Sequence, residues 1–111
     1  MPSSALTLEI TRTGDAALVL CHGKLVYGAT DVLSSQVRPL IPLCRRIVLD
    51  LTDMTVMDSI GLGALVRLYA AARAAGCELQ LIHLRQRIRE LLALTNLLSV
   101  FSVVGEHGIK L

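Results

Sequence analysis

Alternating apolar and polar residues mark the start of the chain. Residues 6–12 have the two-residue period of a β-strand with one buried face. A Gly-Asp turn at 14–15 separates them from a more apolar strand predicted at 16–21, and so short a link allows only an antiparallel hairpin. Further strands are predicted at residues 46–51, 77–83 and 100–104. The first of these three is a continuous apolar run, which is typical of a strand buried on both faces.

Three segments between these strands have the period of an amphipathic helix: residues 28–43, 59–75 and 84–95. In the first, Pro39 and Pro42 should kink the helix or end it early. Gly76 should end the second as a C-terminal cap. The order β-β-α-β-α-β-α-β predicts a single α/β domain with a mixed, mostly parallel sheet, an N-terminal antiparallel hairpin and helices packed against it.

Composition raises the question of a membrane, because 53% of the residues are hydrophobic and the mean hydropathy is +0.62. A membrane-spanning helix needs about 20 nearly uninterrupted apolar residues. The richest stretch, residues 60–75, contains Arg67 and Arg73. The first twelve residues lack the basic start and apolar run of a signal peptide. We therefore expect a cytoplasmic protein without membrane insertion.

The net charge and the spacing of the Cys and His residues argue against nucleic-acid-binding proteins and metal-binding proteins. Eleven Lys and Arg residues against nine Asp and Glu give a net charge of +2, whereas nucleic-acid binding usually requires a concentrated basic face. The three cysteines have no C-x-x-C spacing, and the three histidines have no metal-ligand spacing. We expect free thiols, no cofactor, no metal site and no nucleic-acid partner.

The stretch MTVMDSIGLGAL, at residues 54–65, contains the most informative polar residues. Asp58 precedes the predicted helix and can cap it by accepting hydrogen bonds from backbone N–H groups one turn in. Gly61 and Gly63 each cost the helix about 1 kcal/mol relative to Ala. Two explanations remain open: close packing against a strand, or room for a partner or a phosphate to approach the backbone.

The predicted helix at 59–75 should have a buried and an exposed face. At 100° per residue, the predicted buried side comprises Leu62, Leu65, Leu68, Tyr69 and Ala72. Ile60, Ala64, Arg67 and Ala71 fall on the opposite side. An exposed Ile beside two Ala suggests a partner-binding surface. The alternative is an ordinary, isolated exposed Ile.

Ser59 lies at the N-terminus of this helix, as its first residue or as its cap. No His or Lys close in sequence marks its hydroxyl as an activated nucleophile, so catalysis is not expected. The helix dipole would stabilise a phosphate there by about 0.3–1 kcal/mol. Such a phosphate would place nearly two negative charges beside Asp58 and Ile60. Ser59 is therefore either a capping residue or the site of a phosphorylation switch.

Two longer segments resemble the STAS domain, in particular bacterial anti-sigma factor antagonists. RRIVLDLTDMTVMDSIGLGALVRLYAAARAAGCELQLIH, at residues 45–83, is similar to a strand followed by Asp-Ser-Ser/Thr-Gly-Leu-Gly at a helix start. LRQRIRELLALTNLLSVFSVV, at residues 84–104, is similar to the family's later helix, turn and last strand. The resemblance implies one STAS domain over residues 1–111, with its core at about residues 6–104.

The resemblance also implies a function without catalytic activity. Such proteins bind an anti-sigma factor that is a serine kinase and thereby free the sigma factor. The kinase phosphorylates the Ser that follows the Asp, here Ser59; phosphorylation breaks the complex, and a phosphatase restores it. The residues implied to bind the partner are Val26, Asp58, Ile60, Gly61, Gly63, Ala64 and Arg67.

Three of the positions that depart from the family pattern are Ile60, Lys24 and Val26. Ile60 replaces a hydroxyl residue, and Gly23-Lys24-Leu25-Val26 stands where Gly-Glu-Leu-Asp is common, so Val26 replaces an acid and Lys24 replaces Glu. Apolar residues there suit a more permanent complex. The alternative interpretation is an accessory subunit of a lipid-transporting ABC system, or a scaffold of a signalling assembly.

Overall fold

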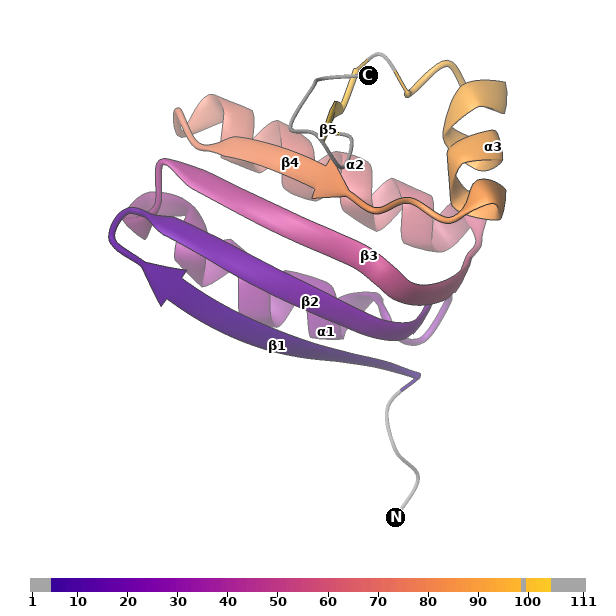
Figure 1. The fold of residues 1–111 in the computed structure, drawn as a ribbon, viewed down its shortest axis with the longest axis horizontal. Coiled ribbons are helices and arrows are strands. Elements are labelled where there is room, and N and C mark those ends of the chain that lie inside the picture. The colour runs from indigo at the N-terminus through magenta and orange to yellow at the C-terminus, as the bar shows by residue number, and fades with distance from the viewer. Residues whose placement is uncertain (1–4, 99, 105–111) are drawn as a thin grey trace.

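Five strands form one sheet in the order β1-β2-β3-β4-β5 (Figure 1). We describe a computed structural model covering residues 5–98 and 100–104. The strands are β1 (Leu6–Thr13), β2 (Ala16–Leu25), β3 (Arg46–Met57), β4 (Glu78–Ile82) and β5 (Ser102–Val104). β1 and β2 form an antiparallel hairpin, and every other neighbouring pair is parallel. The predicted mixed α/β fold is confirmed.

The helices are α1 (Thr30–Val37), the 3₁₀ helix η1 (Arg38–Leu43), α2 (Ser59–Ala74) and α3 (Gln86–Leu94). α1 and α2 lie side by side behind the sheet in Figure 1, whereas α3 lies at one end of β3 and β4. The opposite, front face of the sheet carries no helix among the described residues. One face of the sheet and the helices behind it therefore enclose the core.

Burial along the strands follows this one-sided arrangement. The almost fully buried residues of β1 to β4 are Leu6, Ala17, Val19, Cys21, Leu25, Ile47, Leu49, Leu51, Met54, Leu79 and Leu81. Val48 and Asp50, which alternate with them in β3, are only half-buried. The prediction that β3 is buried on both faces is wrong, because its front face has no helix to cover it.

β3 is twice as long as predicted. It continues beyond residue 51 to Met57, and β2 likewise continues to Leu25. The register of β2 and β3 shifts twice, between Leu20 and His22 and between Gly23 and Lys24. At each shift β3 contains an extra residue, as in a β-bulge, and such a residue interrupts the two-residue alternation. The sequence pattern therefore failed to indicate a strand over 52–57.

The helix ends agree with the predicted end signals. The α-helical part of the first helix ends at Val37, and Pro39 lies in η1, so the expected early end is confirmed. Gly76 follows α2 with a φ of 74°, a left-handed conformation that favours glycine. Its N–H donates to Arg73, and the Cys77 N–H donates to Ala72, which satisfies the last carbonyl groups of α2.

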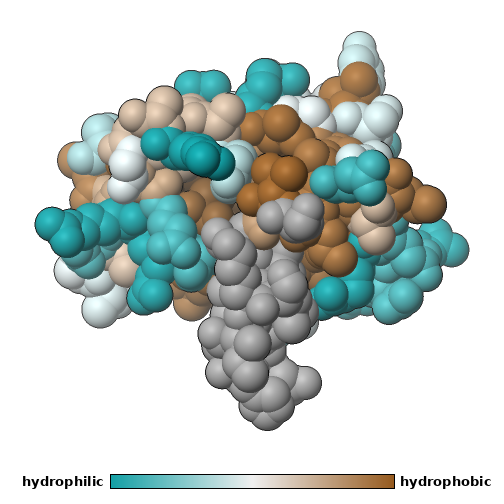
Figure 2. All heavy atoms as spheres, turned by 90° about the horizontal axis from the view of Figure 1, so that it is seen from above, coloured by the Kyte–Doolittle hydropathy of each residue, from teal (hydrophilic) through white to brown (hydrophobic). Residues whose placement is uncertain are grey.

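Hydrophobic residues also gather on the face seen from above, around the side where α3 and β5 lie (Figure 2). Leu94 and Val100 are exposed in this part of the chain. In the part of the chain that the structure describes, no helix has both the length and the hydropathy of a membrane span. The predicted tail at 105–111 lies outside the described residues.

Candidate partner-binding site at the start of α2

Asp58 connects two separate parts of the chain. Its Oδ1 accepts a hydrogen bond of 2.8 Å from the Gly61 N–H, and its Oδ2 accepts one of 3.0 Å from the Tyr27 N–H. The predicted N-cap is confirmed. These backbone N–H groups, Tyr27 first and then Gly61, hold the pKa of the Asp58 carboxyl below its usual value. The carboxylate therefore fixes the loop after β2 to the first turn of α2.

Gly61 packs against the end of β2. A Cβ atom placed on Gly61 would lie 1.9 Å from the carbonyl oxygen of Leu25. The same carbonyl accepts a hydrogen bond of 3.3 Å from the Asp58 N–H. Of the two explanations for this glycine, close packing against a strand accounts for it, because no larger residue fits. Gly61 is buried rather than open to a partner.

Gly63 and Arg67 lie on the outer side of α2. A Cβ atom on Gly63 would be 3.4 Å from Nη1 of Arg67 and would meet no backbone. Arg67 is exposed, as predicted. Its guanidinium group reaches back over Gly63, one turn nearer to the start of the helix. Packing against the strand therefore does not explain Gly63.

The predicted faces of α2 are partly wrong. Ile60 and Arg67 are exposed, but Ala64 is only 3% exposed and Ala71 is half-buried against the core. α2 packs against α1 and η1 as well as against the sheet, so its buried arc is wider than one face. The side chain of Ala64 lies inside that arc. Tyr69, predicted to be buried, is half-buried at its other margin.

Ser59 and Ile60 form the exposed start of α2. Ser59 is the first residue of the helix, directly after its cap, and it is exposed. Ile60 is 50% exposed. The first-turn N–H groups of this 16-residue helix carry the positive end of its dipole. The position thus combines an accessible hydroxyl, a favourable environment for negative charge and an adjacent apolar side chain.

Sequence reasoning missed Tyr27. Val26 is half-buried in the loop after β2, but the next residue, Tyr27, is 80% exposed. Only the hydrogen bond from its N–H to Asp58 places it beside the start of α2. With only two Tyr, one Phe and no Trp in the chain, each aromatic residue could have been considered individually, and this was the only sequence signal for Tyr27.

A second polar cluster lies across the first three strands. Nε2 of His22, in β2, is 2.5 Å from Glu9 of β1, and its Nδ1 is 3.0 Å from Asp53 of β3. A neutral imidazole can donate only one hydrogen bond, whereas carboxylates only accept, so this arrangement favours the imidazolium form. The bond to Glu9 is the main cause that raises the pKa of His22, and Asp53 adds to it.

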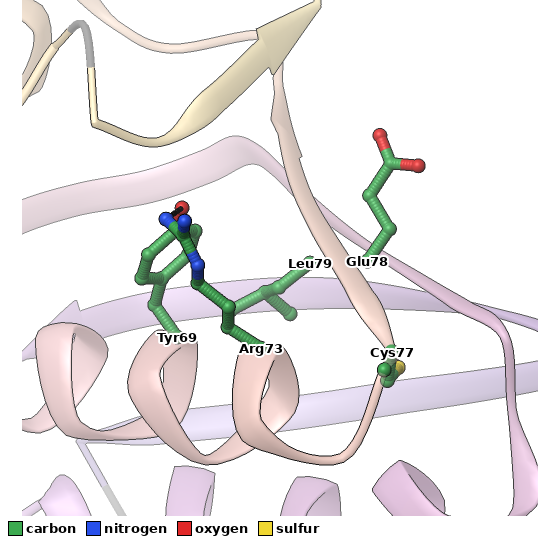
Figure 3. Close-up of a pocket in the computed structure, with 6 residues that line it drawn as sticks. Tyr69, Arg73, Cys77, Glu78 and Leu79 are labelled. Carbon is green, nitrogen blue, oxygen red and sulfur yellow. Dashed lines mark hydrogen bonds between the residues drawn. The ribbon is translucent and has the colours of Figure 1, made fainter.

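The other end of α2 borders a hollow of about 270 Å³ between this helix and β4 (Figure 3). Nη1 of Arg73 lies 3.4 Å from the hydroxyl oxygen of Tyr69, while Glu78 points away from both. Tyr69 also packs edge-on against Phe101 at a centroid distance of 5.1 Å. These contacts stabilise the C-terminal half of α2, far from Ser59.

The three cysteines are free, as predicted, and all three are buried. Burial raises the pKa of the Cys21 thiol to about 12, which leaves it protonated and unreactive. Among the described residues, no group of three or more His, Cys, Asp or Glu side chains is arranged to hold a metal ion. The start of α2 presents an exposed hydroxyl on Ser59 beside the exposed apolar side chain of Ile60.

The profile of the STAS domain matches residues 7–108, which is most of the chain. The chain belongs to the STAS domain family. Several solved structures share its fold. TM1081 of Thermotoga maritima, a candidate anti-sigma factor antagonist, superposes with a TM-score of 0.79 at 19% identity, over 86% of this chain and 84% of that one.

Two further solved structures extend this comparison. Phosphorylated SpoIIAA of Bacillus, a cell fate determinant, has a TM-score of 0.70 at 18% identity and covers 93% of this chain and 94% of its own. A sulfate transporter family protein of Wolinella succinogenes has a TM-score of 0.69 at 17% identity, over 78% and 70% of the two chains. At these identities the similarity establishes the fold and leaves the function to be argued from the site.

Proposed function

We propose that this STAS protein is an anti-sigma factor antagonist of the cytoplasm. It binds an anti-sigma factor that is a serine kinase, and thereby regulates sigma-factor-dependent transcription without catalytic activity of its own. Phosphorylation of Ser59 by that kinase releases the complex, and a phosphatase restores it. The observation that supports this most is an exposed Ser59 at the start of α2, directly after the cap Asp58.

The physics of this position suits a switch. A phosphate on Ser59 would be stabilised by the helix dipole by about 0.3–1 kcal/mol, so the fold tolerates it. The same phosphate would add nearly two negative charges beside Ile60 and the Asp58 carboxylate. A partner that buries Ile60 would have to desolvate those charges without compensation. Modification therefore weakens the complex and leaves the domain folded.

The comparisons support the same function. SpoIIAA is an anti-sigma factor antagonist whose structure is known in unphosphorylated and phosphorylated forms. On this proposal the partner contacts Val26, Asp58, Ile60, Gly63 and Arg67. Gly61 and Ala64 act from below this surface, by allowing α2 to pack closely on β2 and α1.

Calorimetric titration of the purified serine kinase encoded in the same genome, in the presence of ADP, tests the proposal. The wild type and Ser59→Ala should bind. Ser59→Asp should bind at least about tenfold more weakly, because it brings a charge into the contact. Thr13→Asp is the matched control, since it adds the same charge at the exposed end of β1, and it should bind like the wild type.

Two results would contradict the proposal. One is the absence of binding by the wild type to every serine kinase of the anti-sigma class in that genome. The other is equal affinity of Ser59→Asp and the wild type. The first result would favour the alternative function, an accessory subunit of a lipid-transporting ABC system or a scaffold, in which the exposed Ile60 would form a more permanent contact.

A further inference from the structure

The helix-free face of the sheet has an apolar centre. Leu18 and Leu20 of β2 alternate with the buried Val19, so they point away from the helices. Val48 of β3 and Ile82 of β4 point the same way, because their strand neighbours are buried. Leu18 is 38% exposed, and the other three are half-buried. Four aliphatic residues are unusual on a sheet face that no described helix covers (Figure 1).

The strand register makes these four residues one continuous surface, which we call the front patch. Leu18 pairs with Val48 across β2 and β3. In the next row, Leu20 pairs with Asp50, and Asp50 pairs with Ile82 of β4. One charged residue, Asp50, therefore lies among the aliphatic side chains.

The Asp50 carboxylate already has hydrogen-bond partners. Its Oδ1 accepts bonds of 3.0 and 2.6 Å from the N–H and the hydroxyl of Thr52, and Nδ1 of His83 lies 3.1 Å from the same oxygen. Only 15% of the Asp50 side chain is exposed. A molecule that covers the front patch would therefore remove little water from this carboxylate and would leave its hydrogen bonds in place.

One end of the front patch, near the turn at 14–15, carries a free cation. Arg46 and Glu78 are exposed neighbours on β3 and β4. Glu78 accepts a hydrogen bond of 2.8 Å from the side chain of Gln80. The Arg46 guanidinium has no hydrogen bond or ion pair with any described residue. It is therefore available to a carboxylate from outside the molecule.

The opposite end of the front patch carries two acids and two bases. Glu9 and Asp53 flank His22, and 68% and 57% of their side chains are exposed. Lys24 follows on β2 and is exposed as well. Asp53 is the acid on β3 at this end, and the same strand carries Arg46 at its other end.

We propose that the front patch is the interface of a two-fold symmetric dimer, in which it is covered by a second copy of this chain. Two sheets packed face to face align their strands to within about 30°. With the two-fold axis across the strands, between the rows of Leu18 and Leu20, each strand lies antiparallel over its own copy. Leu18 of one copy then lies over Leu20 of the other, and Arg46 lies over Asp53.

Charge complementarity selects this orientation. Arg46 meets Asp53 at both ends of the dimer, and Lys24 lies toward the turn that contains Asp15. With the axis along the strands, between β2 and β3, Arg46 would lie over Ala16 and would meet no acid. The antiparallel arrangement is therefore the one that gives the free guanidinium a partner.

The size of the face indicates a weak dimer. The strands β1 to β4, spaced about 4.8 Å apart and about 20 Å long, present roughly 400 Å² per copy. This is about half of the area that each partner buries in a standard interface. Association should therefore depend on concentration. α2 lies behind the sheet (Figure 1), so the dimer leaves Ser59 uncovered.

Sedimentation equilibrium of the purified protein over about a hundredfold range of concentration tests the dimer. The wild type should shift from monomer toward dimer. Arg46→Asp and Asp53→Arg should each weaken self-association at least about tenfold, because each places like charges over one another. An equimolar mixture of the two variants should restore it, because the exchanged charges match in the mixed dimer. Arg38→Asp, in η1, makes the same charge change beside α1 and α2 and should behave like the wild type.

The apolar centre is tested by Leu18→Ser, which should also weaken self-association. A monomer at every concentration would overturn the dimer. Self-association that is unchanged in both Leu18→Ser and Arg46→Asp would overturn this face as the interface. Failure of the mixture to associate would overturn the antiparallel orientation, whereas restored association also shows that both variants are folded. Kinase binding at Ser59 is measured separately, so these outcomes are independent of the function proposed above.

Discussion

At the scale of single residues, Gly61 and Gly63 look alike in sequence and differ in structure. Gly61 lies under the carbonyl of Leu25, at a distance that leaves no room for a methyl group. Gly63 faces only the flexible end of Arg67. The packing explanation therefore applies to one glycine, and room for a partner remains for the other.

Alanine substitutions should separate the two glycines. Gly61→Ala should lower the free energy of unfolding by about 1–3 kcal/mol, because the new methyl group displaces α2 from β2. Gly63→Ala should keep it unchanged or raise it by up to about 1 kcal/mol, because Ala favours the helix. Chemical denaturation of both variants measures the difference. An unchanged stability of Gly61→Ala would contradict the close approach.

Local sequence signals predicted the structural roles of some residues correctly and those of others incorrectly. Asp58 and Gly76 were predictable because capping depends on neighbours in the chain. Tyr27 was not, because its place beside Asp58 depends on a hydrogen bond across 31 positions. Ala64 was assigned to the wrong face because the sequence does not indicate that α1 also packs against α2.

At the scale of elements, the bulged pairing of β2 and β3 determines where polar side chains meet. The register shift between Leu20 and His22 aligns His22 with Asp53. Glu9 approaches the same imidazole from β1. One imidazole thus connects three strands on the helix-free face. The strand alternation alone could not predict this cluster, because the shift changes which residues are neighbours.

The His22 cluster should make stability depend on pH. A histidine whose pKa is raised on folding contributes stability that is complete below its unfolded value of 6.5 and is lost as the pH rises through its folded pKa. The free energy of unfolding of the wild type should therefore fall as the pH rises above about 6.5. His22→Gln should have a flatter profile in this window.

Denaturant unfolding at a series of pH values measures this difference. Every other histidine is present in both proteins, so the difference between the two profiles isolates His22. Profiles with the same slope would show that the contacts with Glu9 and Asp53 do not favour the imidazolium form in solution.

At the scale of the whole molecule, element order predicted the topology and could not predict how the layers cover the sheet. The short link at 14–15 required a hairpin, and the alternation of strands and helices required parallel neighbours. Which face stays free of helices depends on long-range packing. Val48 and Asp50 of β3 are only half-buried because they lie on the helix-free face. No residue pattern within 46–51 indicated that this face would be free of helices.

This arrangement brings Ser59, Ile60 and Tyr27 to one exposed corner, supported by Asp58 and Gly61 beneath it. The central claim is that Ser59 is the residue through which the kinase controls the complex. Incubation of the purified protein with its kinase and ATP, followed by phosphopeptide mapping, tests it most directly. The account predicts one phosphate, on Ser59, that is absent in Ser59→Ala. Phosphorylation persisting at the same level in Ser59→Ala, or no phosphorylation of the wild type, would contradict it.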